Sequence, residues 1–336
     1  MKLAVVGAGY WGVNLIRVFN RMRVLGCICD FNVQRLQCLA EEYPDVPVEA
    51  SYEAVLNDQS VDAVVIATPA ETHYGLAKRA LLAGKDVFVE KPMTLRADEA
   101  EELTLLAESR ARILMVGHLL EFHPAITRLQ ELVDEGHLGR IEYIYSNRLN
   151  LGKVRREENA LWSFAPHDIS VILLLLKQLP IQVTATGGTY LQPNIADVTI
   201  STMLFSRGTR AHLFVSWLHP YKEQKLVVVG ENRMAVFDDV RATDKLQLYD
   251  KRIDLVDGQF VVERPTAQSV EFPSDEPLLV ECRHFMECIE TRRTPKTDGH
   301  DAWRVLKVLE TSQRSLSMNG EPVQLEPRRS LEMIRA

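Results

Sequence analysis

The chain opens with an apolar run that leads directly into a glycine-rich turn and then into a helix-like segment. The run is Lys2 to Val6, and the turn is Gly7-Ala8-Gly9-Tyr10-Trp11-Gly12. After the turn, apolar residues recur at roughly helical spacing as far as Met22. Strand, glycine turn and helix in this order predict the first unit of a doubly wound parallel sheet.

Each glycine of the turn has a reason to be there. Gly7 permits the tight turn, Gly9 lets the backbone approach a pyrophosphate, and Gly12 lets the helix pack closely on the strand. The turn therefore predicts a dinucleotide site formed by Gly7, Ala8, Gly9, Tyr10, Trp11 and Gly12.

An acidic residue follows the second apolar run. Val24 to Ile28 leads to Asp30, about twenty residues after the turn, where a carboxylate can accept hydrogen bonds from the adenosine ribose. Asp30 favours NAD over NADP because it would repel a 2′-phosphate. Arg35 is near enough in sequence to leave that preference open. The alternative for Asp30 is a surface carboxylate that ends a strand.

A lysine closes another predicted strand. Val87-Phe88-Val89 is followed by Glu90-Lys91-Pro92. Ligands of doubly wound sheets bind beyond the carboxyl ends of the strands, so Lys91 and a nicotinamide can share one crevice. The two motifs together indicate a dehydrogenase. Without its motif, Lys91 would be read as a solvated surface lysine.

Length and composition agree with a soluble enzyme of two domains and argue against a nucleic-acid or membrane partner. The chain has 336 residues, 46% of them hydrophobic, and a formal net charge of −7, whereas nucleic-acid binding requires a basic surface. No apolar run reaches membrane-spanning length and no signal segment opens the chain, so we expect a cytoplasmic protein. The five cysteines lack zinc-site spacing, so we expect reduced thiols and no metal.

The pattern of elements changes near residue 118. Before it, strands and helices alternate, and this predicts a Rossmann doubly wound parallel sheet over residues 1–118. After it, residues 119–336 predict an α+β domain with a large, mainly antiparallel open sheet. The expected helices there span about 123–135, 277–291 and 299–318, and the tail from Pro322 looks irregular and charged.

The chain resembles the Gfo/Idh/MocA oxidoreductases, an α/β family, over nearly its whole length. The resemblance rests on the glycine turn, Ala67-Thr68-Pro69 with His73, Glu90-Lys91-Pro92, Gly117-His118 with His123-Pro124, and Pro166-His167-Asp168. It implies NAD as cofactor, with Thr68, Pro69, His73 and Glu90 completing its site. For His73 a structural role is an equal alternative.

The resemblance also implies the catalytic pair. Lys91 matches the family lysine that contacts nicotinamide and the reacting hydroxyl, and His167 matches the histidine that faces it. Many members carry an aspartate four residues before this histidine, where this chain has Ser163. A lysine with a pKa of about 10.4 must lose about three units to act as a base at pH 7, whereas a histidine is already mostly neutral. Lys91 is favoured as the base, with His167 orienting or relaying; the alternative for His167 is a helix cap through Asp168.

The substrate side resembles family members that oxidise the 3-hydroxyl of UDP-linked amino sugars such as UDP-N-acetylglucosamine, whose keto product is aminated for lipid A. Arginine binds phosphate bidentately, so the basic run containing Arg148, Lys153, Arg155 and Arg156 suits a diphosphate. Its alternative is a solvated loop balanced by nearby glutamates. The substrate residues expected are Lys91, Arg148, Asn150, Arg155, Trp162 and His167, although Trp162 also suits an interior position.

Other functions remain open from the sequence alone. A free polyol or sugar dehydrogenase of the inositol 2-dehydrogenase type, or one for UDP-N-acetylglucosaminuronate, fits the same fold. A binding protein that senses NAD without turnover is a non-enzyme alternative, although it would not need both Lys91 and His167. If one face of the second sheet is open and apolar, we expect a homodimer or homotetramer.

Overall fold

The computed structural model describes residues 1–325 and divides the chain into two compact units. Unit 1 comprises residues 1–130 and 272–306, and unit 2 comprises residues 131–271 and the chain from 307 onward. The segment 272–306 therefore returns to the unit that holds the N-terminus. The predicted tail from Pro322 lies largely outside the described residues; within them, Val323–Gln324 forms the short strand β17.

Unit 1 is built on a parallel six-stranded sheet with the order β3-β2-β1-β4-β5-β6. The strands are β1 (Leu3–Val6), β2 (Leu25–Cys29), β3 (Val48–Glu49), β4 (Ala63–Ile66), β5 (Asp86–Glu90) and β6 (Leu114–Gly117). The order reverses direction at β1, because β2 and β4 lie on its two sides. Such a switch point opens a crevice at the carboxyl ends of the strands, where the glycine turn begins.

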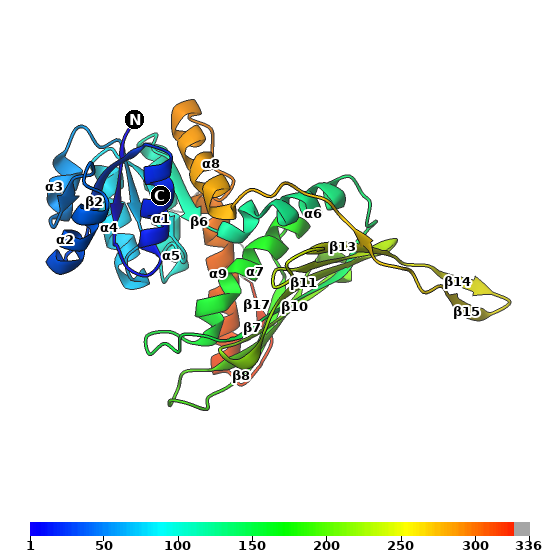
Figure 1. Cartoon of the computed structure of the whole chain (residues 1–336). Helices are drawn as coiled ribbons and strands as arrows, with labels where there is room; N and C mark the ends of the chain where they lie inside the picture. The colour runs from blue at the N-terminus through cyan, green and yellow to red at the C-terminus, as the bar shows by residue number, and fades with distance from the viewer. Residues whose placement is uncertain (326–336) are drawn as a thin grey trace, which may run out of the picture. The chain divides into compact units, whose positions relative to one another are not determined.

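Helices cover both faces of this sheet (Figure 1). The connecting helices are α1 (Gly12–Arg21), α2 (Val33–Glu42), α3 (Tyr52–Asn57), α4 (Ala70–Leu82) and α5 (Ala97–Ser109), followed by the short η1 (Leu119–Phe122) and α6 (Pro124–Asp134). Helix α8 (Pro277–Thr291) joins the same core, and the ring of its Phe285 packs edge-on against Phe88 of β5 with centroids 5.6 Å apart. Both phenylalanines are completely buried, so α8 is part of the interior of unit 1.

Unit 2 contains a nine-stranded sheet with the order β16-β13-β12-β11-β7-β10-β9-β8-β17. All its neighbours run antiparallel except β10 and β7. The strands are β7 (Ile141–Leu151), β8 (Gln182–Gly188), β9 (Val198–Leu204), β10 (Arg210–Ser216), β11 (Leu218–Gly230), β12 (Arg233–Asp238), β13 (Leu246–Asp250) and β16 (Gln268–Ser269), with η2 (Ser206–Gly208) between β9 and β10. The predicted fold class, a parallel Rossmann sheet followed by a mainly antiparallel sheet, is confirmed.

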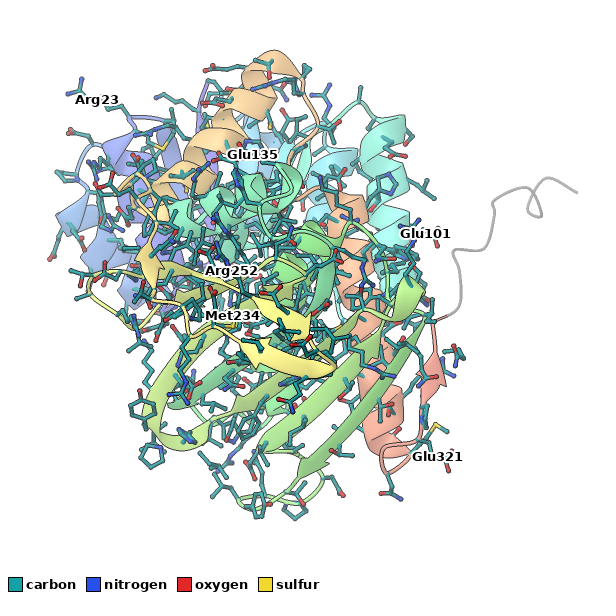
Figure 2. The ribbon with its side chains drawn as sticks, turned by 90° about the vertical axis from the view of Figure 1, so that its right-hand side faces the viewer. Arg23, Glu101, Glu135, Met234, Arg252 and Glu321 are labelled. Carbon is teal, nitrogen blue, oxygen red and sulfur yellow. The ribbon has the colours of Figure 1, made fainter. Side chains whose placement is uncertain are left out.

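The two faces of the nine-stranded sheet differ. Helix α7 (Ala160–Leu176) packs on one face, and the side chains that face it, such as Met203 and Leu213, are buried. On the other face Ile200 is 48% exposed. The antiparallel hairpin β14 (Ile253–Val256) and β15 (Gln259–Val262) projects away from the sheet, next to Arg252 (Figures 1 and 2). The last long helix is α9 (Gly299–Ser317). The boundary between the two units in the chain, after residue 306, falls inside this helix.

Candidate active site

The glycine turn has a separate structural reason for each glycine. Gly7 has φ +92°, a left-handed conformation that favours glycine. A Cβ on Gly12 would stand 1.9 Å from the carbonyl oxygen of Gly7, so only glycine lets α1 start this close to the turn. A Cβ on Gly9 would meet nothing within 4 Å. The space in front of Gly9 is thus open to a bound molecule, as a pyrophosphate requires.

Asp30 holds the glycine turn from the carboxyl end of β2. Its Oδ2 accepts a hydrogen bond from the backbone N–H of Ala8 at 2.7 Å and one from Nη1 of Arg35 at 3.3 Å. Its Oδ1 accepts from the backbone N–H of Asn32 at 2.8 Å. A carboxylate has about four acceptor positions, so one further bond, to a ribose hydroxyl, can be made. Arg35 lies half-exposed beside the same carboxylate.

The loop after β4 is tied to the loop after β5 by His73. Its Nε2 lies 2.8 Å from the carbonyl oxygen of Thr68, and its Nδ1 lies 2.8 Å from that of Pro92. The ring is buried, and burial lowers the pKa of His73 despite these two contacts. Both ring nitrogens face backbone, which favours the structural alternative for His73. Pro69 precedes the first residue of α4, and Thr68 shares a hydrogen bond with Thr72.

The end of β5 brings Glu90 next to the glycine turn. The indole Nε1–H of Trp11 donates to Oε1 of Glu90 at 2.5 Å, and the backbone N–H of Lys91 donates to Oε2 at 3.2 Å. Gly117 of β6 packs against the same carboxyl group, since a Cβ there would lie 3.0 Å from its atoms. Trp11 therefore connects the predicted dinucleotide turn to the Glu90-Lys91-Pro92 motif.

Burial changes the protonation of the groups around Lys91. It raises the pKa of Glu90 to about 7, although the bond from Trp11 and the charge of Lys91 act in the opposite direction. His118, directly after β6, is buried, and burial together with the charge of Lys91 lowers its pKa to about 3. His118 is therefore neutral at pH 7, while Glu90 titrates in the physiological range.

His167 lies inside helix α7 of unit 2. The helix begins at Ala160, and the side chain of Asn159 caps it by accepting from the backbone N–H of Trp162 at 3.2 Å. The alternative that His167 caps the helix through Asp168 is wrong, because the cap residue, Asn159, lies nine residues before Asp168, and Asp168 bonds elsewhere. His167 is instead a partly exposed residue of the second turn.

Asp168 forms a buried ion pair with Arg148. Nε of Arg148 donates to Oδ2 at 2.6 Å and Nη2 donates to Oδ1 at 3.2 Å, while Oγ of Ser146 donates to Oδ1 at 2.7 Å. The side chains of Arg148 and Asp168 are only 13% and 4% exposed. Two guanidinium nitrogens predicted to meet a diphosphate are thus occupied, and the pair fixes β7 to α7.

The other expected substrate residues of unit 2 also have protein partners. Trp162 Nε1–H donates to Oε1 of Gln313 on α9 at 3.2 Å, and Arg155 pairs with Glu158 at 3.0 Å. The side-chain oxygen of Asn150 is buried without a hydrogen-bond partner in the described part of the chain. Sequence reasoning missed Gln313 and Asp168 as partners, because their contacts join residues 151 and 20 positions apart in the chain.

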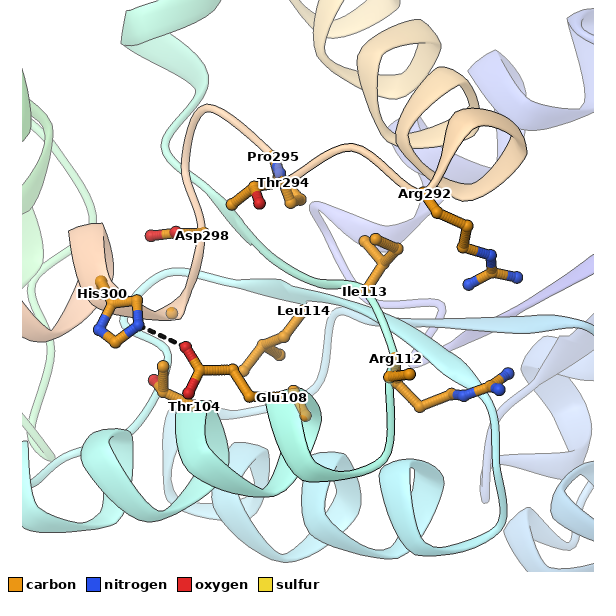
Figure 3. A pocket seen from close by; sticks show the side chains of 13 residues that line it. Thr104, Glu108, Arg112, Ile113, Leu114, Arg292, Thr294, Pro295, Asp298 and His300 are labelled. Atoms are coloured by element: carbon orange, nitrogen blue, oxygen red, sulfur yellow. Dashed lines mark hydrogen bonds and ion pairs between the residues drawn. The ribbon is translucent and has the colours of Figure 1, made fainter.

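A separate pocket of about 550 Å³ lies beside the amino end of β6, whereas the glycine turn follows the carboxyl end of β1 (Figure 3). Its lining includes Ile113 and Leu114, at the amino end of β6. His300 and Glu108 pair beside it at 2.6 Å. The glycine turn and Lys91 follow the carboxyl ends of β1 and β5, so this pocket is not the predicted dinucleotide site.

Among residues 1–325, no group of three or more His, Cys, Asp or Glu side chains is arranged to hold a metal ion. All five cysteines are free thiols. Burial raises the pKa of Cys27 to about 11 and that of Cys29 to about 12, so both are protonated and unreactive at neutral pH. No helix within the described residues is long and apolar enough to cross a membrane.

Two family models match the chain. The oxidoreductase family model with an NAD-binding Rossmann fold matches residues 1–118, and the GFO/IDH/MocA C-terminal domain model matches residues 126–236. The chain belongs to the Gfo/Idh/MocA oxidoreductase family. It is an NAD-dependent dehydrogenase of the sugar type, and the predicted family, enzyme class and cofactor are confirmed.

Relatives from this family match nearly the whole chain. UDP-N-acetylglucosamine 3-dehydrogenase of Acidithiobacillus ferrooxidans is 28% identical over 91% of this chain and 94% of its own. A solved structure of that enzyme has a TM-score of 0.84 at 26% identity and covers 95% of this chain and 98% of its own. The NAD-dependent scyllo-inositol 2-dehydrogenase of Bacillus subtilis is 26% identical over 98% of both chains.

The residues of unit 1 fit NAD. Three features match the parts of a dinucleotide. The open space before Gly9 and the backbone turn at the start of α1 suit the pyrophosphate, and the remaining acceptor position on Asp30 suits the ribose. When bound, NAD supplies a hydride acceptor. The residues of this chain must then position the substrate and take the hydroxyl proton.

Proposed function

We propose that this protein oxidises the 3-hydroxyl of UDP-N-acetylglucosamine to the 3-keto form in the cytoplasm, and that the product enters amino-sugar synthesis for lipid A. The likeness to a UDP-N-acetylglucosamine 3-dehydrogenase over more than nine tenths of both chains carries this proposal. The fold supports it, because the same relative has a TM-score of 0.84 to this structure.

The reaction divides its atoms between cofactor and protein. Bound NAD would supply the acceptor for the hydride from the C3–H bond, and the proton of the O3–H bond would pass to a base of this chain. We assign this proton to Nζ of Lys91, which follows the carboxyl end of β5, and an orienting or relaying role to His167 on α7. The products are the keto sugar, NADH and one proton, so the atoms and electrons balance.

The basic run of unit 2 supports a nucleotide-sugar. Arg148 is bound to Asp168 and Arg155 is bound to glutamates, whereas Lys153 and Arg156 are exposed. We therefore assign the diphosphate contacts to Lys153 and Arg156, the two exposed members of the predicted basic run. A hydrogen bond to a charged group is worth about 1.5–3 kcal/mol. Two such contacts therefore favour binding of a substrate with the diphosphate over one without it by on the order of 100-fold or more.

A substrate comparison tests the proposal. The kcat/KM for UDP-N-acetylglucosamine is expected to exceed that for free N-acetylglucosamine by on the order of 100-fold, followed as NADH formation. A Lys153→Met/Arg156→Met variant should raise the KM for the UDP sugar, whereas Lys222→Met, at an exposed lysine on β11, should not. NMR of the product identifies the oxidised carbon. An equal kcat/KM for the free sugar would show that the enzyme does not recognise the diphosphate.

The second candidate is a free polyol dehydrogenase. The scyllo-inositol 2-dehydrogenase that covers 98% of both chains favours it. Efficient turnover of scyllo-inositol, with weak turnover of the UDP sugar, would replace the first proposal by this one.

We also propose that two or four copies associate through the uncovered face of the nine-stranded sheet. Ile200 of β9 lies opposite Phe214 of β10, and His212 of β10 stacks on Tyr145 of β7 with ring centroids 5.4 Å apart. A half-exposed apolar and aromatic stripe of this kind is typical of an interface between copies. An Ile200→Lys variant is expected to sediment as a 38.1 kDa monomer, and a wild-type monomer would contradict the proposal.

A further inference from the structure

The hairpin of β14 and β15 leaves the nine-stranded sheet between two strands that pair with each other. Strand β13 precedes the hairpin and β16 follows it, and Leu248 of β13 lies opposite Gln268 of β16. Within the described residues, β14 and β15 pair only with each other. We call residues 253–262 the arm, and Figure 1 shows the arm extending beyond the sheet. The arm is thus an excursion from the sheet edge, held at its base.

The sequence of the arm explains why it forms a hairpin. Asp257 and Gly258 join its two strands, with φ of +50° and +76°. Two central residues with positive φ are typical of a type I′ turn, whose twist matches that of the flanking strands. At the base, Arg252 and Glu263 form an ion pair at 3.4 Å, and the backbone N–H of Glu263 donates to the carbonyl oxygen of Arg252 at 3.3 Å. Both ends of the hairpin are therefore closed by local contacts.

One face of the arm is entirely apolar. Ile253 lies opposite Val262, and Leu255 lies opposite Phe260. Residues two positions apart in a strand share a face, so these four side chains lie together. They are between 53% and 77% exposed. We call these four residues the apolar face of the arm.

The opposite face of the arm is mixed. It pairs Asp254 with Val261 and Val256 with Gln259. An isolated two-stranded hairpin is only marginally stable in water, and a contiguous exposed apolar surface marks an interaction site. The apolar face of the arm is therefore a surface that a partner covers.

The charges of the arm disfavour a lipid surface as this partner. Residues 251–264 contain three basic and three acidic side chains. Asp254 and Asp257 are acids within the arm itself, and Arg252 is already paired with Glu263. Segments that bind anionic lipids carry an excess of lysine and arginine. The arm fits an apolar protein surface instead.

The same unit of this chain contains such a surface. Met234 of β12 lies opposite Tyr249 of β13 and, on its other side, opposite Val229 of β11. Val229 in turn lies opposite Tyr143 of β7, so an apolar and aromatic row crosses four strands. Tyr143 is 43% exposed and lies two residues before Tyr145, so this row is on the uncovered face of the sheet. We call Tyr143, Val229, Met234 and Tyr249 the apolar row.

The apolar row begins where the arm leaves the sheet. Tyr249 of the row is four residues before Ile253, the first residue of the arm, and Figure 2 labels Met234 and Arg252 near this place. The arm is therefore continuous with the sheet face that we assign to association between copies.

The size of the apolar face suits reciprocal docking of two copies. Its four side chains expose on the order of 500 Å² of surface. In a two-fold dimer each copy provides one arm and receives one. Two arms and the surfaces that receive them would then bury on the order of 2,000 Å², as in stable dimers. One chain thus supplies both the arm and a surface that matches it.

We propose that the arm of one copy docks, with its apolar face, on the apolar row of a second copy. This inference rests on the proposed association through the uncovered sheet face, and it is independent of the proposed substrate. Each copy of a two-fold dimer provides one arm and one row, so the dimer contains two equal contacts between arm and row.

Two matched variants of the arm test the proposal by sedimentation. Leu255→Lys/Phe260→Lys places two lysines opposite each other on the apolar face, and Val256→Lys/Gln259→Lys places the same two lysines opposite each other on the mixed face. The first variant is expected to raise the dissociation constant at least about 1,000-fold and to sediment as a 38.1 kDa monomer. The second is expected to associate as the wild type does. All four positions are exposed, and NADH binding checks that each variant is folded.

A mixture of two variants tests where the arm docks. Tyr143→Lys changes the apolar row but keeps the arm, whereas Leu255→Lys/Phe260→Lys changes the arm but keeps the row. Each variant alone is expected to be monomeric. Together they can form one of the two contacts of the dimer, so the mixture is expected to contain heterodimers. Absence of heterodimers at concentrations where the wild type is fully associated would overturn docking on the row.

The remaining outcomes also decide the proposal. If Leu255→Lys/Phe260→Lys stays associated while Ile200→Lys dissociates, the arm proposal is overturned and the sheet interface stands. Equal dissociation of the two arm variants would assign the effect to added charge and not to the apolar face. Flotation with phosphatidylcholine and phosphatidylserine vesicles is expected to show no binding. Vesicle binding that Leu255→Lys/Phe260→Lys removes, with unchanged association, would assign the arm to a lipid surface.

Discussion

Replacement of Lys91 by methionine is expected to lower kcat by about 10²–10⁴-fold, the usual contribution of a positioned general base. Methionine keeps a long unbranched side chain but cannot accept a proton. The backbone N–H of residue 91 still donates to Glu90, so the end of β5 keeps its geometry. Stopped-flow measurement of NADH formation gives the rate, and NADH fluorescence gives the affinity, which should change only a few-fold.

Two companion variants make this result specific. His167→Asn should reduce kcat by a smaller factor if His167 orients or relays, and should shift the pH profile of kcat. Lys2→Met removes an exposed lysine from the same unit and should leave kcat unchanged. Near-normal turnover in both Lys91→Met and His167→Asn would show that the catalytic assignment is wrong.

Replacement of Arg148 by methionine is expected to destabilise unit 2 by about 3–5 kcal/mol, because it leaves Asp168 buried and charged without its partner. The free energy of unfolding, from urea denaturation, measures this loss. The double variant Arg148→Met/Asp168→Leu removes both charges and should recover most of the stability.

Arg155→Met is the matched control for this substitution. Arg155 pairs with Glu157 and Glu158 in a more exposed position, so its loss should cost less than about 1 kcal/mol. A stable Arg148→Met variant with a strongly raised KM for UDP-N-acetylglucosamine would restore the diphosphate role predicted for Arg148. A large loss of stability with an unchanged KM in the folded fraction would confine Arg148 to structure.

The sequence predicted the strands and helices of residues 1–118 well because local signals coincide there, but it did not predict that residues 272–306 belong to the same unit. Each buried parallel strand is a short apolar run, and the glycine turn fixes where the first strand ends and α1 begins. The start of α7 was harder to find. Pro166, His167 and Asp168 interrupt the apolar pattern, so periodicity locates only the apolar second half, whereas Asn159 caps a helix that begins at Ala160.

The partners of the polar residues could not be read from the sequence. Glu281 falls on an amphipathic helix, where a glutamate is normally expected at the surface, and only the packing of α8 against β5 buries it. Arg148 looked like a phosphate ligand because its neighbours in the chain are basic. Its actual partner, Asp168, is brought to it by the packing of α7 on β7. Contacts of this kind depend on tertiary structure, which local composition does not encode.

The return of α8 to the first unit limits how this nucleotide-binding half can be transplanted. Leu278, Phe285 and Ile289 fill the same interior as the parallel strands, although more than 150 residues separate them from β6. A contiguous cassette that stops at residue 118 would leave that interior uncovered to solvent. A chimera that exchanges cofactor specificity between relatives must therefore carry both segments of unit 1, residues 1–130 and 272–306. The segment inserted between them must bring the chain back to the start of α8.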